Sequence, residues 1–417
     1  MLKQVETSRA IAETIALCRP EVVCAYPITP QTHIVEGLAE LVSSEALSRC
    51  EFINVESEFA ALSVAIGASA AGARAYTATA SQGILFMAEA IYNAAGLGLP
   101  IVMTIGNRAI GAPINIWNDH SDSMAMRDAG WIQLYAETAQ QAADLHVLAF
   151  RLAEEISCPV MVCVDGFVLT HSYERIDLPA QSDVDAYLPP FEPRQLLDPA
   201  QPISIGAMVG PEAFMEVRFL AHHKQLRAVE RIPELSRDFK QRFGRSPGGL
   251  LQTYLTQDAE TIVIALGSVN GTVQDVVDEM RDAGVPIGSI SVCCYRPFPS
   301  AALRSAVGCA RRVLVLEKSL TPGVGGMVAA DVRTALAGNT IRISTAIAGL
   351  GGRPITKASL RKLFKMAESC GLEDLTFVDL KPDIIQRHLQ HESTQSVGRA
   401  SSEPLVSDIR TVAAQIG

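Results

Sequence analysis

The sequence predicts an α/β protein with two parallel-sheet domains. Short apolar runs alternate with helical segments from residue 7 to 170 and again from residue 261 to 346, and this alternation is typical of parallel sheets with helical crossovers. The 417 residues are 48% hydrophobic, which suffices for more than one core. Six prolines between residues 179 and 202 indicate that a connecting segment separates the two regions.

The first region begins with a helix and then supplies strands and helices in turn. In chain order we expect a helix over 8–17, a strand over 22–25, a helix over 32–41, a strand over 52–55, a helix over 56–73, a strand over 75–79, a helix over 84–96, and strands over 101–105 and 160–164. Helix 56–73 is apolar on almost every side, so we expect it to be buried, and its small residues permit close packing.

The second region repeats this pattern on a smaller scale. We expect strands over 261–266, 290–295, 312–317 and 341–346, with helices over 272–283, 300–306 and 327–337. One helical piece, 211–243, lies in the connecting segment and is too charged to form a core. The predicted segments are therefore a first domain over 1–170, a connecting segment over 171–258, a second domain over 259–368 and a C-terminal extension over 369–417.

Charge and hydropathy exclude several classes of partner. The net charge of -10 comes from scattered acidic residues, and no basic patch stands out, so neither nucleic acid nor an anionic membrane surface is an expected partner. The first ten residues lack an apolar signal core, and no apolar stretch of membrane-spanning length is free of polar or charged residues. We therefore expect a soluble, cytoplasmic protein without a membrane segment.

The nine cysteines are spread along the chain without a Cys-x-x-Cys pair, which is typical of reduced, buried thiols. Iron-sulfur clusters and structural zinc require several thiolates close together. We therefore expect neither on this chain, and no metal ligands. Adjacent Cys293 and Cys294 lie within one predicted strand, where their side chains would point to opposite faces, so we do not expect a redox pair.

A hydroxyl, a carboxylate and a guanidinium follow three separate apolar runs. They belong to Thr29 in the segment Tyr26–Pro30, to Glu58 and to Arg108. In a parallel sheet they would meet at the carboxyl edge, where open α/β sheets bind ligands. The residues alone leave other roles open. Thr29 could cap a helix, and Arg108 could be a surface cation. Glu58 could be an acid that offsets the helix dipole, a role for which Glu56 is equally suitable.

Three further motifs invite a ligand interpretation. The turn Ser81-Gln82-Gly83 joins a strand to a helix, where backbone amides can approach a cofactor. Residues Asp119, His120 and Asp122 resemble a metal motif, but their spacing places the side chains on different faces, and helix capping explains the composition. The glycines of 323–326 lack the rest of a phosphate-binding fingerprint, so a tight strand-to-helix turn is the better interpretation.

Taken together, the motifs resemble those of the alpha subunit of pyruvate:ferredoxin oxidoreductase and related thiamine-diphosphate-dependent 2-oxoacid oxidoreductases. The resemblance covers nearly the whole length. It rests on Tyr26-Pro27-Ile28-Thr29-Pro30, Val55-Glu56-Ser57-Glu58, Thr79-Ala80-Ser81-Gln82-Gly83, Asn107-Arg108-Ala109 and residues 115–122, followed by Tyr295-Arg296-Pro297-Phe298-Pro299 and Gly349-Leu350-Gly351-Gly352-Arg353.

This resemblance implies both fold and roles. The first domain would be similar to the pyrimidine-binding domain of thiamine enzymes, and the second to the C-terminal domain of transketolases. Glu58 would hydrogen-bond the aminopyrimidine nitrogen and act as the catalytic acid. Thr29 and Arg108 would hold the carboxylate of the 2-oxoacid, a task that suits the planar guanidinium. Pro27 and the turn Ser81-Gln82-Gly83 would line the cofactor.

The chain lacks the Gly-Asp-Gly motif through which thiamine enzymes hold magnesium and the diphosphate. Magnesium needs oxygen ligands in near-octahedral geometry, so another polypeptide must supply them. The family implies a beta subunit that carries the diphosphate and magnesium half-site and an iron-sulfur cluster, together with gamma and ferredoxin-like delta subunits. A flavin subunit that passes electrons to NAD is a further option.

The implied reaction is the coenzyme-A-dependent oxidative decarboxylation of a 2-oxoacid to acyl-CoA and CO2, active only with partner subunits. Pyruvate is the default substrate. Phenylglyoxylate, giving benzoyl-CoA with electrons passed to NAD, is an alternative, because Gly111 stands where the family commonly has a larger residue. An alternative of another class is a scaffold subunit without catalysis. A complete stand-alone thiamine enzyme is disfavoured by the missing diphosphate motif.

Overall fold

Residues 2–369 and 371–394 are described by a computed structural model. The chain divides into two units, residues 1–376 and 377–417, of which the first contains both large sheets. Within the second unit, helix α14 spans Pro382–Thr394. Cys370 and residues 395–417 of the predicted C-terminal extension lie outside the described residues. The domain boundaries expected from the sequence remain a prediction.

The first sheet has seven strands in the order β12-β6-β7-β5-β4-β2-β3. All neighbours are parallel except β12, which runs antiparallel to β6. The strands are β2 (Val22–Ala25), β3 (Glu51–Asn54), β4 (Ala75–Thr79), β5 (Val102–Asn107), β6 (Ile132–Tyr135), β7 (Val160–Asp165) and β12 (Cys294–Arg296). β4, β5, β6 and β7 are buried along their whole length, as expected for a parallel sheet covered on both faces.

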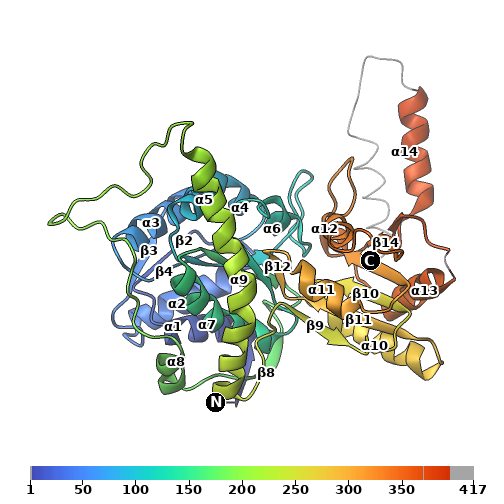
Figure 1. Cartoon of the computed structure of the whole chain (residues 1–417), viewed down its shortest axis with the longest axis horizontal. Helices are drawn as coiled ribbons and strands as arrows, with labels where there is room; N and C mark the ends of the chain where they lie inside the picture. Colours follow the sequence, from blue (N-terminus) through green and yellow to red (C-terminus); the bar gives the residue numbers. More distant parts are fainter. Residues whose placement is uncertain (1, 370, 395–417) are drawn as a thin grey trace, which may run out of the picture. The chain divides into compact units, whose positions relative to one another are not determined.

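Helices connect these strands, and a small antiparallel pair lies beside them. The pair is β1 (Leu2–Glu6) with β8 (Tyr173–Asp177). The helices are α1 (Thr7–Leu17), α2 (Thr32–Ser43), α3 (Glu58–Ala70), α4 (Gln82–Phe86), α5 (Ala88–Leu97), α6 (Ser121–Ala125), α7 (Ala139–Ile156), α8 (Gln181–Tyr187) and α9 (Phe214–Phe243). The long helix α9 packs against α7 (Figure 1).

The structure corrects the sequence prediction at several elements. The predicted helix 84–96 is two helices, α4 and α5, separated at Met87. β6 and α7 were not among the predicted elements, and β7 lies between β5 and β6 in the sheet. α9 is not uniformly polar, because Ile232, Leu235 and Phe239 in its second half are buried. The predicted helix 56–73 is α3, and it is not buried all round, since Phe59 is 38% exposed.

The second sheet has the order β15-β14-β13-β10-β11-β9, parallel from β14 to β11 and antiparallel at β9. Its strands are β9 (Leu251–Tyr254), β10 (Thr261–Ala265), β11 (Ile287–Val292), β13 (Arg312–Glu317), β14 (Arg342–Ile347) and β15 (Leu375–Phe377). Its helices are α10 (Val269–Asp282), α11 (Ser300–Val307), α12 (Met327–Ala335) and α13 (Lys357–Glu368). α10 packs with α13, and α11 packs with α12.

The predicted strand 290–295 is in fact two strands that join different sheets. β11 belongs to the second sheet, whereas β12 extends the first, so Cys293 lies at the crossing between them. Cys293 and Cys294 are buried and free, and burial raises the pKa of the Cys293 thiol to about 12. The described cysteines form no disulfide, and all are buried except Cys309, which is exposed against expectation.

A buried charged cluster fastens the first sheet to the second. Asp165, at the end of β7, accepts hydrogen bonds from His120 Nε2 at 2.7 Å, from Lys318 Nζ at 2.9 Å and from the backbone N–H of Ser268 at 3.0 Å. Burial by itself would raise the pKa of Asp165, but Lys318 and His120 hold it well below its usual range. Asp165 is therefore an ionised anchor between the two sheets.

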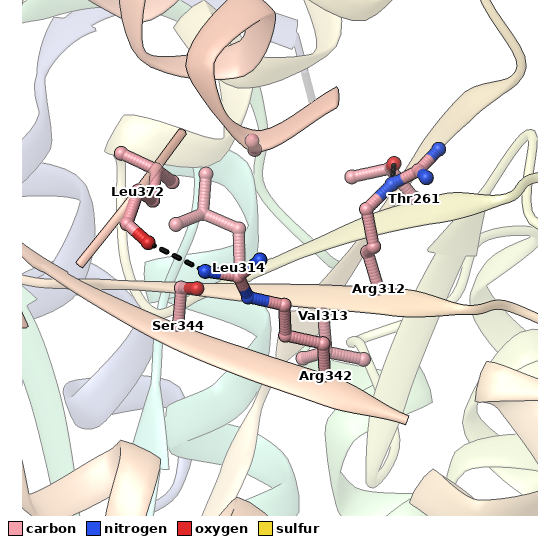
Figure 2. A pocket seen from close by; sticks show the side chains of 8 residues that line it. Thr261, Arg312, Val313, Leu314, Arg342, Ser344 and Leu372 are labelled. Atoms are coloured by element: carbon pink, nitrogen blue, oxygen red, sulfur yellow. Dashed lines mark hydrogen bonds between the residues drawn. The ribbon is translucent and has the colours of Figure 1, made fainter. Parts of the chain in front are cut away.

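A small cavity lies at the amino edge of the second sheet, where Thr261, Arg312 and Arg342 each begin a strand (Figure 2). Arg312 Nε donates to Thr261 Oγ1 at 2.8 Å, and Arg342 Nη2 donates to the Leu372 carbonyl at 2.8 Å. Ligands of parallel sheets bind at the opposite, carboxyl edge. The cavity is therefore a packing feature and not a candidate site.

Among the described helices, none is long and apolar enough to cross a membrane.

Candidate active site

Four neighbouring strands bring the predicted site residues to one sheet edge. β5, β4, β2 and β3 are adjacent and parallel, so the segments that follow them leave the sheet at its carboxyl edge. Arg108 follows β5, Ser81 follows β4, Thr29 follows β2 and Glu58 follows β3. The predicted gathering of these residues at the carboxyl edge therefore agrees with the strand order.

Arg108 and the Thr29 backbone are in direct contact. Arg108 Nη1 donates to the Thr29 carbonyl at 3.0 Å, and Nε donates to the Asn115 carbonyl at 3.0 Å. Arg108 is only 7% exposed, and burial lowers the pKa of its guanidinium, against the attraction of Asp122. Within the described part of the chain, no carboxylate forms an ion pair with Arg108. A buried cation with unused donors is suited to an anionic ligand.

Asp122 holds the turns on both sides of Arg108. One of its oxygens accepts from the backbone N–H groups of Ser81 at 3.0 Å and Arg108 at 2.9 Å. The other accepts from Asn107 Nδ2 at 2.8 Å and the Ser123 N–H at 2.7 Å. Burial raises the pKa of Asp122 to about 7, although these four donors act in the opposite direction. Asp122 therefore positions Arg108 and Ser81.

The turn after β4 has an unusual backbone. Ser81 adopts φ 48, a region that side chains other than glycine rarely occupy. Its hydroxyl donates to the Ala109 carbonyl at 2.5 Å and also contacts the side chain of Gln82. Together with the Asp122 contact, these bonds hold a strained conformation, which is a common feature of functional sites. Pro27 is exposed and lies two residues before Thr29.

Glu58 is the buried acid at this edge. Ser57 caps α3, because its side chain accepts from the Ala60 N–H at 3.2 Å, so Glu58 is the first helical residue. Its side chain is 8% exposed, whereas Glu56 lies outside the helix and is exposed. Among the described residues, the Glu58 carboxylate has no hydrogen-bond or ion-pair partner. Burial of an acid without a protein partner favours a ligand-binding role.

Gly83 faces Glu58 and leaves room for its side chain. A Cβ atom at Gly83 would lie 2.8 Å from Cγ and from Oε1 of Glu58, and would also collide with Thr79 Oγ1. The Thr79 hydroxyl is buried and lacks a hydrogen-bond partner among the described residues. A carboxylate and an unpaired hydroxyl beside a glycine match the ring nitrogen and exocyclic amine of an aminopyrimidine, so these residues fit thiamine diphosphate.

The second domain closes one side of this region. Asn115 Nδ2 donates to the Gly351 carbonyl at 3.2 Å, and Asp119 accepts from the Gly351 N–H at 3.0 Å. Asp119, His120 and Asp122 therefore contact three different parts of the chain. Their side chains do not converge, as expected from their spacing. His120 occupies the N-cap position of α6 without a side-chain cap, so capping is only part of the explanation.

The glycine turn at 323–326 is not an open phosphate cradle. Glu317 reaches the start of α12 and accepts from the backbone N–H groups of Val328 at 3.0 Å and Ala329 at 2.8 Å. A Cβ atom at Gly326 would collide with this carboxylate. Burial raises the pKa of Glu317 to about 7, against the backbone N–H groups of Ala329, Val328 and Met327. The position that an anion would take is therefore filled by the protein's own carboxylate.

Two family models match the chain. Residues 13–237 match "Pyruvate flavodoxin/ferredoxin oxidoreductase, thiamine diP-bdg", and residues 259–360 match "Pyruvate:ferredoxin oxidoreductase core domain II". Pyruvate synthase subunit PorA of Methanosarcina barkeri is 43% identical over 390 residues, which cover 91% of this chain and 97% of the relative. The chain belongs to the family of 2-oxoacid:ferredoxin oxidoreductase alpha subunits. This confirms the resemblance found in the sequence.

A second relative of this alpha subunit is named for a different 2-oxoacid. Ketoisovalerate oxidoreductase subunit VorA of Pyrococcus abyssi is 37% identical over 378 residues, 89% of this chain and 95% of the relative. The comparisons give no support to the NAD-linked aromatic alternative. They place the alpha subunit in an oxidoreductase family, as predicted.

Solved structures show the same fold. A 2-oxoglutarate:ferredoxin oxidoreductase from Magnetococcus marinus, with 2-oxoglutarate, coenzyme A and succinyl-CoA bound, superposes with a TM-score of 0.66 at 19% identity. The match covers 88% of the alpha subunit and 65% of that chain. A split-gene transketolase superposes with a TM-score of 0.52 at 14% identity, covering 89% and 100% of the two chains. The predicted combination of a thiamine-diphosphate-binding domain and a transketolase-like domain is confirmed.

Sequence reasoning missed three residues that organise the site. Asp122 was set aside as part of a false metal motif, and Asp165 and Lys318 were not considered. Asp165 and Lys318 each directly follow or end a buried apolar strand. A charged residue at the end of a buried strand was the available signal, since charges are rarely fully buried unless paired.

Replacing Gly83 with alanine tests the contact with Glu58. The new methyl group would displace the Glu58 side chain, so we expect kcat of the assembled enzyme to fall by about 10- to 100-fold, as misplacement of a catalytic group typically does. Gly96→Ala in α5 is the matched control, because a Cβ there meets nothing within 4 Å. Equal kcat in the two variants would show that Glu58 tolerates displacement or has no role.

Proposed function

We propose that this chain is the alpha subunit of an enzyme that oxidatively decarboxylates pyruvate and transfers the acetyl group to coenzyme A, with electrons passed to ferredoxin. The observation that carries the proposal is that two buried charged residues lie at one sheet edge without ion-pair partners in the described part of the chain. Among the described residues, the buried Glu58 carboxylate has no hydrogen-bond or ion-pair partner, and the buried Arg108 guanidinium has no carboxylate partner. A cofactor base and a substrate carboxylate would satisfy them respectively.

Each group has a distinct task in this proposal. Arg108 binds the substrate carboxylate through its unused N–H donors, and the exposed side chain of Thr29 adds a hydroxyl beside it. Glu58 hydrogen-bonds the aminopyrimidine nitrogen and thereby favours the tautomer that can accept a proton. The chemistry that thiamine diphosphate supplies when bound is a nucleophilic carbon and a sink for the electrons released with CO2.

The alpha subunit would provide only half of the site. Its sequence has no Gly-Asp-Gly motif, and Glu317 fills the start of α12. We therefore assign the diphosphate and magnesium, together with an iron-sulfur cluster, to a beta subunit. Iron-sulfur clusters would lie only on the partner subunits, which would also include gamma and ferredoxin-like delta subunits, because the described cysteines of this chain are dispersed and mostly buried.

Exposed apolar side chains beside the site are where we place the partner subunit. Phe59 and Phe86 are 38% and 60% exposed, their rings lie 6.4 Å apart, and they are close in sequence to Glu58 and Gly83. Exposed apolar clusters are typical of protein interfaces. A second group of large apolar side chains is exposed along the segment that leads into α9 and along its first half: Ile203, Met208, Phe214, Met215, Phe219 and Leu220.

Pyruvate is the substrate that we propose, for two reasons. The Methanosarcina barkeri relative, which is 43% identical, is named pyruvate synthase subunit PorA. In addition, the lack of a side chain at Gly111 does not leave a space for a bulky acid, because a Cβ there would lie 2.5 Å from Gln82 Nε2. The Gln82 amide thus occupies the space in which an enlarged pocket had been expected.

The test uses the complex assembled from this chain and its partner subunits. Reduction of a viologen dye that depends on coenzyme A is followed with pyruvate, 2-oxoglutarate, branched 2-oxoacids and phenylglyoxylate. We expect the highest kcat/KM with pyruvate, and no decarboxylation by the isolated chain with magnesium and thiamine diphosphate. A preference for another acid would overturn the substrate assignment, whereas activity of the isolated chain would overturn the half-site assignment.

A further inference from the structure

Three potential metal ligands converge away from the candidate active site. They are Glu6 at the end of β1, His33 in the first turn of α2 and His171 after β7, and one ligand atom of each lies within 4.8 Å of the others. The three residues are far apart in the sequence, so the expectation that the chain has no metal ligands could not take their contact into account.

Backbone hydrogen bonds fix the position of Glu6 relative to the segment that carries His171. The Thr7 N–H donates to the Ser172 carbonyl at 2.9 Å, and the Ser8 N–H donates to the Thr170 carbonyl at 3.1 Å. β1 also pairs with β8, which places Glu6 opposite Tyr173. The start of α1 is therefore fastened to the segment that carries His171, and Glu6 needs little reorganisation to bind a ligand with it.

Hydrogen bonds also orient the two imidazoles. His171 Nδ1 lies 2.7 Å from Thr170 Oγ1, which leaves Nε2 for a ligand, and such a contact on the second ring nitrogen is usual for metal-binding histidines. His33 Nδ1 lies 2.7 Å from Glu6 Oε1, and the His33 and His171 rings are 4.7 Å apart.

We propose that Glu6, His33 and His171 form a binding site for a transition-metal ion of the Zn²⁺ or Co²⁺ class. Two imidazole nitrogens and one carboxylate oxygen suit such ions, whereas magnesium prefers oxygen ligands alone. Three protein ligands leave a coordination position for water or an external group.

The local charges set the strength of this site. The amino ends of α1 and α2 carry partial positive charge and oppose a cation, and the Glu6 carboxylate offsets them. Two nearby basic side chains, Lys3 and Arg9, are engaged by the acids Glu13 and Glu40. We therefore expect moderate affinity, with dissociation constants in the micromolar range.

Cobalt binding to the isolated, untagged full-length chain tests the proposal. After treatment with a chelator, Co²⁺ is titrated and followed by calorimetry and by its visible absorption. We expect one ion per chain, displaced by Zn²⁺, with the dissociation constant raised at least tenfold by His33→Ala and by His171→Ala. Glu6→Gln should raise it less. The matched control is the double variant His222→Asn/His223→Asn, which removes two adjacent exposed histidines of α9 and should bind as the natural chain does.

The binding results can be distinguished from a folding defect. His33 is exposed, with 46% of its side chain accessible, so His33→Ala should fold, and a thermal melt without metal checks this. Unchanged affinity in both single histidine variants would overturn the proposal, as would loss of binding in the α9 double variant alone. The assay needs neither partner subunits nor thiamine diphosphate, so its result is independent of the proposed enzymatic function.

Discussion

Replacing Glu58 with glutamine should lower kcat of the assembled enzyme by about 10²- to 10⁴-fold, the range typical of lost acid-base catalysis. Glutamine keeps the size of the side chain but offers an amide that cannot donate or accept a proton in the same way. The Glu58 carboxylate has no hydrogen-bond partner within the described part of the chain, so its removal breaks no structural contact seen there. Formation of acyl-CoA from pyruvate by the assembled complex measures the effect.

Glu56→Gln is the matched control for this experiment. Glu56 carries the same charge two residues earlier but is exposed and precedes the helix. We expect kcat within about twofold of the natural enzyme, because exposed positions away from special features rarely matter. Unchanged acyl-CoA formation in the Glu58 variant would remove the catalytic assignment and favour a scaffold role for this subunit.

The carboxyl edge of the first sheet was predictable because it depends on local patterns. Apolar runs mark the strands, and parallel strands place the residues that follow them on one edge. Thr29, Glu58 and Arg108 could therefore be grouped before any contact was known. The choice between Glu56 and Glu58 could not be made locally, since both suit a helix start. It depends on Ser57, whose side chain caps α3 and turns Glu58 inward.

The supporting residues were not predictable, because their roles depend on contacts between distant segments. Asp122 binds the turn after β4, 41 residues earlier in the chain, through the Ser81 N–H. The strand predicted over 290–295 also shows the limit of pattern reasoning. The run is mostly apolar and suggests one strand, yet its residues belong to two strands, β11 and β12, in different sheets. Tertiary packing decides this division.

Replacing Asp165 with alanine should destabilise the chain by about 3–5 kcal/mol, the cost of leaving a buried charge without its partner. Lys318 is 7% exposed, and Asp165 is its only ion-pair partner among the described residues. The same change removes the acceptor of His120 and of the Ser268 N–H, so the first and second sheets lose their charged contact. The midpoint of urea unfolding of the isolated chain measures the loss.

The companion variants Lys318→Met and Asp165→Ala/Lys318→Met complete a double-mutant cycle. We expect the double variant to lose less than the sum of the two single losses, because it buries no unpaired charge. The sign of the pH dependence follows from the lowered pKa of Asp165. The stability that the Asp165 carboxylate contributes is present above the unfolded pKa of about 3.9 and is lost as pH falls through the lower folded value. The difference in free energy of unfolding between the natural chain and Asp165→Ala should therefore narrow in acid. Additive losses, or a gap that widens in acid, would show that the carboxylate does not anchor the two sheets as an ion.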